Sequence, residues 1–251
     1  KIVINVRTKN IIKKLSSKFK NLEVYDHHTC HAATAYYYSG FKDCYTLTID
    51  GWGDNSSSKL FECKNGLIKE IKRTPTIDSL GYFYGSITKL LGFTPHKHEG
   101  KILGLAAYSN PKKAYSDISK LISYNKITKN FEGNIEKGFY LPSFENKLLT
   151  PLKKKYKSSE IAAATQKRLE DVVLEYVIDI SKKPFNLSLA GGVFSNVKLN
   201  QKLCEIKKVK NIYVFPNMGD GGLAVGAASL CSNKQKRYKK FFTKNMYLGP
   251  E

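Results

Sequence analysis

The chain has 251 residues, of which 41% are hydrophobic and 25% are charged. This composition is typical of a globular protein and excludes collagen-like and low-complexity chains, and no apolar run approaches the roughly 20 residues that a membrane-spanning helix needs. The formal net charge is +21, but only four of the 42 basic residues are arginine, the residue that reads base edges, so we expect a lysine-rich surface without specific nucleic-acid binding.

Predicted strands and helices alternate through the first part of the chain. The β-branched and aromatic residues of Cys44–Asp50 predict a strand, and Asn65-Gly66 is typical of the two-residue type I′ turn of a hairpin. Apolar residues spaced three and four apart predict helices, one of them alanine-rich and beginning at His27. In chain order we expect strands at 2–6, 22–25, 44–50, 58–63 and 67–73, and helices at about 11–19, 27–39, 80–91 and 101–108.

The second part of the chain begins with a polar, lysine-rich segment. Residues 110–157 show little periodicity and are predicted to be a peripheral connector or insertion. Beyond them we expect helices at about 159–182, 195–203 and 220–230, and strands at 187–190 and 212–215. Because strands alternate with helices, we predict an α/β fold with a first lobe at 1–109 and a second lobe at 158–251.

The cysteines indicate the redox setting of the protein, and the first residues indicate that the chain is a fragment. Five cysteines without C-x-x-C spacing encode neither a disulfide framework nor a thiolate zinc site, so we expect a reducing, cytoplasmic setting. Cys30 lies within a histidine cluster, but small buried cysteines are common and we interpret it as structural. The opening KIVINVRTKN lacks an initiator Met and the features of a signal peptide, so we expect a fragment of a longer protein, truncated at both ends.

Two histidines and two aspartates are candidate metal ligands. His27 and His31 are four residues apart, so on a helix both imidazoles project from one face, although an isolated pair of this kind is more often structural. Asp50 ends a predicted buried strand, and Asp220 lies at the start of a predicted helix. Two imidazoles with two carboxylates suit iron, manganese or zinc better than calcium.

Glycines flank these residues at positions where the backbone could approach an anion. Gly51 and Gly53 follow Asp50, and Gly221 follows Asp220 at a helix N-terminus, where unpaired amides favour a phosphate. Gly191-Gly192 lies between a predicted strand and a helix, which would allow close approach of a ligand. Lys101 follows a glycine and could act as a point charge towards phosphate, although a single lysine in this chain is more often on the surface.

In this order, six segments resemble the carbamoyltransferase family of nodulation and antibiotic-tailoring enzymes, whose main domain is similar to the universal tRNA threonylcarbamoyladenosine synthase. The resemblance runs from about Asp26 to Glu251. It implies a fold of the actin, sugar-kinase and Hsp70 type, with two ribonuclease-H-like lobes around a nucleotide cleft. The segments are DHHTCHAATAY, LTIDGWGD, SLGYFYGSITKLLGF, EGKILGLAAY, LAGGVFSNVKLNQKL and PNMGDGGLAVGAA.

The resemblance also implies roles for individual residues. It identifies the metal ligands as His27, His31, Asp50 and Asp220, with iron the expected ion and manganese or zinc the alternatives. It assigns adenosine contacts to Gly191, Gly192 and Asn196. Lys101 is assigned to the phosphate side and to catalysis.

Family members make carbamoyl-adenylate from carbamoyl phosphate and ATP in a separate domain, which we expect beyond Leu248-Gly249-Pro250. They then transfer the carbamoyl group to a hydroxyl, so we predict a metal- and ATP-dependent O-carbamoyltransferase with a small-molecule acceptor. The chain departs from the family in the short segment before His27 and in Ile102-Leu103, where Val-Met is more usual, and we expect it to be incomplete alone. A tRNA threonylcarbamoyladenosine transferase and a non-catalytic nucleotide-binding regulatory module are the alternatives.

Overall fold

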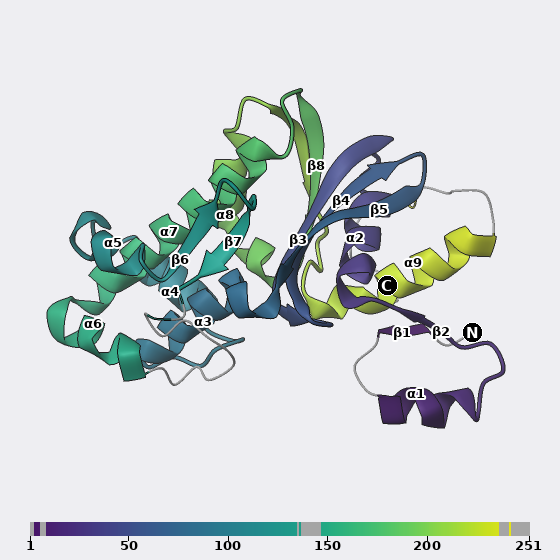
Figure 1. The fold of residues 1–251 in the computed structure, drawn as a ribbon, viewed down its shortest axis with the longest axis horizontal. Helices are drawn as coiled ribbons and strands as arrows, with labels where there is room; N and C mark the ends of the chain where they lie inside the picture. The colour runs from purple at the N-terminus through teal and green to yellow at the C-terminus, as the bar shows by residue number, and fades with distance from the viewer. Residues whose placement is uncertain (1–2, 6–8, 135, 137–146, 236–240, 242–251) are drawn as a thin grey trace, which may run out of the picture.

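A five-stranded mixed sheet forms the centre of the computed structural model, which describes residues 3–5, 9–134, 136, 147–235 and 241 (Figure 1). Its strands are β3 (Asp43–Gly53), β4 (Ser56–Lys64), β5 (Leu67–Pro75), β8 (Phe185–Ala190) and β9 (Val209–Val214). Their order is β5-β4-β3-β8-β9. β4 is antiparallel to β3 and β5, whereas β8 is parallel to β3 and β9.

Helices cover both faces of this sheet (Figure 1). On one face α2 (His27–Tyr38) contacts β3 and β8, and α9 (Leu223–Gln235) packs against α2. On the other face α3 (Leu80–Leu90) contacts β3 and α7 (Ser158–Asp179), and α8 (Val197–Cys204) contacts α7 and β9. Further helices are α1 (Lys9–Ser16), α4 (Glu99–Ala106), α5 (Lys112–Ile118) and α6 (Thr150–Lys155), with 3-10 turns at 76–78, 147–149, 192–195 and 220–222.

Alternate residues of β3 belong to two different core clusters. Leu47 and Ile49 pack with residues of α3 and α7 in the main core, whereas Cys44 packs with Ala33 and Tyr36 of α2. Successive side chains of a strand point to opposite faces, so a central strand between two helical layers is buried on both. The end of β3, which carries Asp50, is thereby held at a fixed place between the layers.

A separate two-stranded parallel sheet lies near the N-terminus. It pairs β1 (Val3–Asn5) with β2 (Glu23–Tyr25), and α1 connects them. The predicted order of strand, helix and strand is confirmed, although positions 2 and 6 of the predicted first strand lie outside the described residues. α1 ends at Ser16, three residues before the end of the helix predicted at about 11–19.

The central sheet takes its strands from both predicted lobes. β3, β4 and β5 come from the first predicted lobe and β8 and β9 from the second, yet all five are in one sheet. Parallel strands need a long crossover connection between them, so neighbours in a sheet can be far apart in the sequence. Local patterning shows that each strand exists but not which strand is its neighbour.

The segment predicted to be a peripheral connector contributes to the core. α5, α6 and the hairpin of β6 (Ile122–Asn125) and β7 (Asn130–Gly133) all contact α7. Ala114, Ile118 and Phe131 are buried in the main cluster. The apolar residues of these short elements are few and widely spaced, so their periodicity is weak although Ala114, Ile118 and Phe131 are almost completely buried. Positions 135 and 137–146 lie outside the described residues.

The predicted type I′ hairpin between β4 and β5 is confirmed. Asn65 has φ 50° and Gly66 has φ 86°, which are the two left-handed conformations that this turn requires. Within the described part of the chain, no helix is long and apolar enough to cross a membrane.

Candidate metal centre

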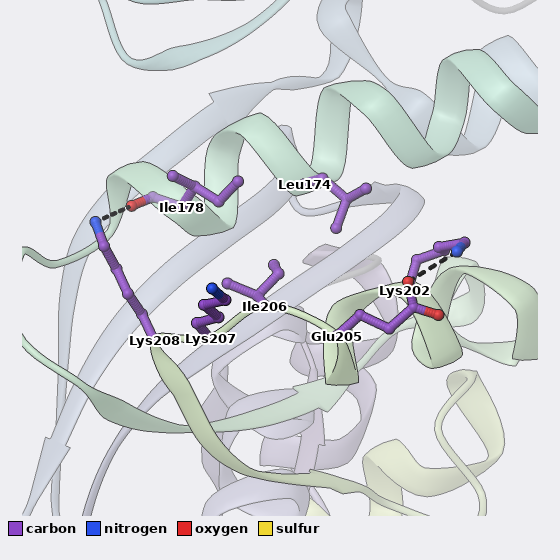
Figure 2. A pocket seen from close by; sticks show the side chains of 7 residues that line it. All are labelled: Leu174, Ile178, Lys202, Glu205, Ile206, Lys207 and Lys208. Carbon is purple, nitrogen blue, oxygen red and sulfur yellow. Dashed lines mark hydrogen bonds and ion pairs between the residues drawn. The ribbon is translucent and has the colours of Figure 1, made fainter.

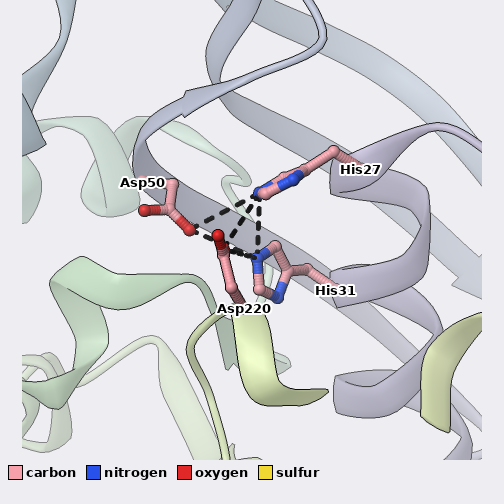
Figure 3. A group of neighbouring side chains, drawn as sticks. All are labelled: His27, His31, Asp50 and Asp220. Atoms are coloured by element: carbon pink, nitrogen blue, oxygen red, sulfur yellow. Dashed lines mark hydrogen bonds and ion pairs between the residues drawn. The ribbon is translucent and has the colours of Figure 1, made fainter. Parts of the chain in front are cut away.

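The four predicted metal ligands lie together at one end of the central sheet (Figure 3). His27 and His31 come from the first turns of α2, Asp50 from the last part of β3, and Asp220 from the 3-10 turn before α9. One donor atom of each side chain lies within 4.8 Å of the donor atoms of the other three. Segments from three distant parts of the chain therefore converge on one point.

The distances between these donor atoms fit one metal ion. His27 Nε2 and His31 Nε2 are 3.1 Å apart. Asp50 Oδ2 lies 3.6 Å from His27 Nε2 and 3.2 Å from His31 Nε2, and Asp220 Oδ1 lies 3.6 and 3.7 Å from the same two nitrogens. Ligand atoms bound at about 2.1 Å in a tetrahedral site are about 3.4 Å apart. The donor set, two imidazoles and two carboxylates, also suits iron, manganese or zinc.

Asp50 is held in its charged form. Burial acts to raise the pKa of its carboxyl, but hydrogen bonds with His27 and His31 and from the amide of Gly51 lower that pKa well below its usual range. Gly51 N–H donates to Oδ1 at 2.8 Å, and Gly192 N–H donates to Oδ2 at 3.2 Å. The carboxylate is therefore ionised at neutral pH and oriented by two backbone amides.

The two histidines are buried, whereas Asp220 is exposed. The His31 side chain is fully buried, and 59% of the Asp220 side chain is accessible. Burial acts to lower the pKa of His31, but the neighbouring carboxylates of Asp220 and Asp50 raise it above its ordinary value. The proximity of His31 in turn lowers the pKa of Asp220. Asp220 therefore marks the side from which solvent or a ligand reaches the cluster.

The first turn of α2 is tied to neighbouring segments. Asp26 caps the helix, and its Oδ1 accepts a hydrogen bond from Thr29 N–H at 2.9 Å. The backbone N–H of His27 donates to Asp54 Oδ2 at 2.8 Å. Neither aspartate was predicted to have a role. An aspartate directly before a helical segment is the signal that could have identified Asp26, whereas the contact of Asp54 has no local signal.

His28 lies between the two predicted ligands in the sequence and has a structural role. Its Nε2 is 3.1 Å from the carbonyl oxygen of Ser56, and its Nδ1 is 2.9 Å from Thr48 Oγ1. Burial, followed by the proximity of His27, lowers the pKa of His28 to about 4. The ring is therefore neutral near pH 7, where its Nε2–H donates to Ser56 and its Nδ1 accepts from Thr48.

Two of the predicted glycines lie where a side chain would collide with the site. A Cβ on Gly53 would lie 2.2 Å from Cδ2 of His27. Gly191 has φ +101°, a conformation that favours glycine, and a Cβ there would lie 2.2 Å from the carbonyl oxygen of Ile49. These glycines allow the ends of β3 and β8 to lie against each other and against the first turn of α2.

The other predicted glycines lie next to the ligands. The backbone N–H groups of Gly51 and Gly192 both donate hydrogen bonds to the Asp50 carboxylate, and Gly221 follows Asp220 in the same 3-10 turn. Their role in binding a phosphate or a nucleotide stays a prediction.

Asn196 and Lys101 have contacts outside the four-residue cluster. Asn196 caps α8: its Oδ1 accepts from Leu199 N–H at 3.0 Å, and its Nδ2 donates to Gln166 Oε1 at 2.8 Å. Lys101 is exposed on α4, with Nζ 5.7 Å from the centre of the Phe93 ring. Their predicted roles on the adenosine and phosphate sides stay predictions.

An apolar groove with a volume of about 390 Å³ lies between α7 and the connection from α8 to β9 (Figure 2). Leu174, Ile178 and Ile206 supply its apolar surface, and Lys202 and Glu205 form an ion pair of 2.8 Å beside it. None of the predicted site residues lines this groove.

Comparison with known proteins places this site in a family. Residues 2–229 match the family model described as carbamoyltransferase N-terminus. The chain belongs to this family. The matched region contains all four residues of the candidate metal centre, and the resemblance of the six segments to carbamoyltransferases is confirmed.

Relatives of this carbamoyltransferase-family chain are considerably longer than the chain. An uncharacterised protein of Methanocaldococcus jannaschii is 35% identical over 247 residues, which cover 90% of the chain and 39% of that protein. Nodulation protein NolNO of Sinorhizobium fredii is 32% identical over 220 residues, which cover 83% of the chain and 31% of NolNO. Nodulation protein NolO of Bradyrhizobium diazoefficiens is 29% identical over 239 residues, which cover 90% of the chain and 42% of NolO. The chain thus spans less than half the length of each.

Solved structures share the fold at low sequence identity. Full-length HypF in its phosphate- and nucleotide-bound form has a TM-score of 0.57 and 13% identity, with 93% of the chain and 46% of HypF covered. Component A of Acidaminococcus fermentans (R)-2-hydroxyglutaryl-CoA dehydratase has a TM-score of 0.54 and 17% identity, with 91% of the chain and 74% of component A covered. The predicted α/β fold of the actin, sugar-kinase and Hsp70 type is confirmed, and its division into two lobes stays a prediction.

Proposed function

We propose that the chain is the carbamoyl-transfer part of an O-carbamoyltransferase that requires a metal ion and an adenylate. The convergence of His27, His31, Asp50 and Asp220 in a carbamoyltransferase-family chain carries this proposal. The nodulation relatives support transfer to a small-molecule hydroxyl. HypF in its phosphate- and nucleotide-bound form has a similar fold, which supports a nucleotide ligand.

In this proposal the four side chains hold one Fe²⁺ ion, or Mn²⁺ or Zn²⁺, through His27 Nε2, His31 Nε2 and one oxygen each of Asp50 and Asp220. The ion supplies positive charge that stabilises the adenylate phosphate as a leaving group. Asp50 contributes a carboxylate that the backbone amides of Gly51 and Gly192 orient.

The glycine-rich segments take the adenylate itself. Gly191, Gly51, Gly53 and Gly221 place backbone without side chains beside the metal ligands, where its amides can approach the phosphate of the adenylate. Lys101 is assigned to the phosphate side. The acceptor oxygen then bonds to the carbamoyl carbon while the bond from that carbon to the phosphate oxygen breaks, so AMP leaves with the bonding electrons and the hydroxyl proton is released to solvent. Fixed positions for both partners lower the entropic part of the barrier.

A second domain supplies the activated donor in this proposal. Carbamoyl phosphate and ATP would be converted to carbamoyl-adenylate there, in a part of the full-length protein outside this chain. The relatives are long enough to contain such a domain, because the chain covers only 31% of NolNO and 42% of NolO.

Titration calorimetry on the purified chain tests the binding part of this proposal. We expect AMP, the leaving group, to bind in the presence of Mn²⁺, and we expect His31→Ala and Asp220→Ala to weaken both Mn²⁺ and AMP binding. Lys113→Ala, which changes an ion pair to Glu160 near the start of α7, is the control. AMP binding of equal affinity with and without Mn²⁺ would contradict the assigned ligands.

Two further measurements distinguish the alternatives. The net charge of +21 favours a contact with RNA. Tight tRNA binding that weakens steeply with salt would support a tRNA threonylcarbamoyladenosine transferase. Nucleotide binding by the full-length protein without carbamoyl transfer to any hydroxyl would support a non-catalytic regulatory module.

A further inference from the structure

Lys59 is a buried lysine with two carboxylate partners. Its side chain is 4% exposed, and its Nζ lies 2.9 Å from Asp26 Oδ2 and 3.0 Å from Glu70 Oε2. A buried charge is costly unless it is paired and hydrogen-bonded, so these two carboxylates fix where the ammonium group lies. Lys59 is in the middle of β4, whereas Asp26 directly precedes α2.

Asp26 connects this lysine to the helix that carries both histidines of the candidate metal centre. Asp26 Oδ1 accepts from the backbone N–H of Thr29 at 2.9 Å and from its hydroxyl at 3.0 Å, while Oδ2 pairs with Lys59. One carboxylate thus caps α2 and ties its first turn to the sheet. A shift of this turn along β4 would break either the cap or the ion pair.

A second contact holds the same turn to β4. His28 Nε2 lies 3.1 Å from the carbonyl oxygen of Ser56. His28 follows His27 directly and precedes His31 by three residues, so both contacts with β4 lie within one turn of the candidate ligands. The donor atoms of His27 and His31 are only 3.1 Å apart, which leaves little tolerance for movement of this turn relative to Asp50.

We propose that Lys59 is a positioning residue for the metal centre: by holding Asp26, it fixes the first turn of α2 where His27 and His31 meet Asp50. This inference rests on the metal site of the proposed function. Groups that orient metal ligands without touching the metal commonly change metal affinity by about 10- to 100-fold when removed.

Titration with Co²⁺ tests this role, because the visible d–d absorption of Co²⁺ reports the ligand geometry as well as the affinity. Lys59→Met removes the charge and keeps a side chain of similar length. We expect the Kd for Co²⁺ to rise by about 10- to 100-fold, with an altered d–d band, while far-UV circular dichroism shows a folded protein. A folded Lys59→Met protein with unchanged affinity and spectrum would overturn the inference.

Glu70→Gln is the matched control, because it removes the other carboxylate partner of Lys59 and leaves the Asp26 link in place. We expect its Kd for Co²⁺ to stay within about threefold of the unchanged protein, since Glu70 does not contact α2 through an ion pair. Equal effects of Lys59→Met and Glu70→Gln on Co²⁺ binding would mean that Lys59 acts only on general stability, and this would also overturn the inference.

Asp26→Ser provides a second variant in case Lys59→Met folds poorly. Serine retains a side-chain oxygen that caps α2 but cannot pair with Lys59. We expect Asp26→Ser to weaken Co²⁺ binding. The double variant with Lys59→Met should bind Co²⁺ no more weakly than whichever single variant binds it less tightly, because both substitutions break the same Asp26–Lys59 ion pair. Additive effects would contradict action through Asp26. If the unchanged protein does not bind Co²⁺, the proposed metal site is contradicted, and the role of Lys59 is contradicted with it.

Discussion

A Cβ on Gly226 would lie 2.0 Å from the carbonyl oxygen of Cys30. Gly226 is in α9 and Cys30 is in α2, so these two helices pack with their backbones in direct contact. α2 carries both histidines of the candidate metal centre, and Asp220 lies just before α9. The absence of a side chain at one glycine therefore sets how closely the histidines and Asp220 approach each other.

Gly226→Ala should destabilise the protein and weaken metal binding. Alanine favours a helix over glycine by about 1 kcal/mol, but here its methyl group must push α9 away from α2, which typically costs about 1–3 kcal/mol in a packed interior. We expect a lower free energy of unfolding in urea and a higher Kd for Co²⁺. Gly104→Ala on α4 is the control, because its Cβ would meet no atom within 4 Å, and a gain of about 0.4–1 kcal/mol is expected there. A Gly226→Ala protein as stable as the Gly104→Ala protein would contradict this packing.

Gly53→Ala should disturb the metal centre. The added Cβ would lie 2.2 Å from Cδ2 and 2.5 Å from Cγ of His27, so the substitution must displace this candidate ligand. We expect Co²⁺ affinity to fall by about tenfold or more. Gly219→Ala, next to Asp220 but with no atom within 4 Å of its Cβ, should leave Co²⁺ affinity within about twofold. Equal affinities of the two variants would show that His27 is not a ligand.

Acid should destabilise the protein partly through His28. Its pKa is 6.5 in the unfolded chain and about 4 in the fold, so between these values the unfolded state binds more protons and stability falls as the pH falls. The loss is complete below about pH 4 and amounts to about 3 kcal/mol. We expect urea unfolding of His28→Gln to show a smaller loss than the unchanged protein over this range. Parallel pH profiles of the two proteins would mean that His28 is not neutral in the fold.

Cysteine labelling should distinguish Cys204 from Cys30. Burial, together with the nearby carboxylates of Asp26 and Asp54, raises the pKa of Cys30 to about 12, whereas Cys204 is exposed. Because the thiolate is the reactive form, iodoacetamide near pH 8 should modify Cys204 and leave Cys30 unmodified until urea unfolds the chain. Peptide mass spectrometry measures both sites. Modification of Cys30 at the rate of Cys204 in the folded protein would show that this part of α2 opens readily.

Local physics accounts for the features that the sequence predicted correctly. The spacing of His27 and His31 places both rings on one face of a helix because α-helices repeat every 3.6 residues. Asn65-Gly66 predicts its hairpin because both residues tolerate left-handed conformations. Such features depend on residues that are close in the chain, so a single sequence contains them.

Features that depend on contacts between distant segments were not predicted. The polar segment at 110–157 was predicted to be peripheral, but short elements within it bury Ile118 and Phe131 against α7. Lys59 and Asp54 had no local signal, since each contacts a residue of the α2 start across at least 27 positions of chain. A lysine in a chain with 42 basic residues gives no indication that it is buried.

The sequence by itself determined the four candidate ligands and the family to which the chain belongs, because helix spacing, strand ends and ordered motifs are properties of the chain alone. Only the tertiary structure decided that these ligands meet. Parallel pairing of β3 with β8 brings Gly192 to Asp50, and close packing of α9 on α2 brings Asp220 to the histidines. These contacts form because the free energy gained from hydrophobic burial in the whole fold exceeds the entropic cost of closing long loops. No local sequence pattern shows whether it does.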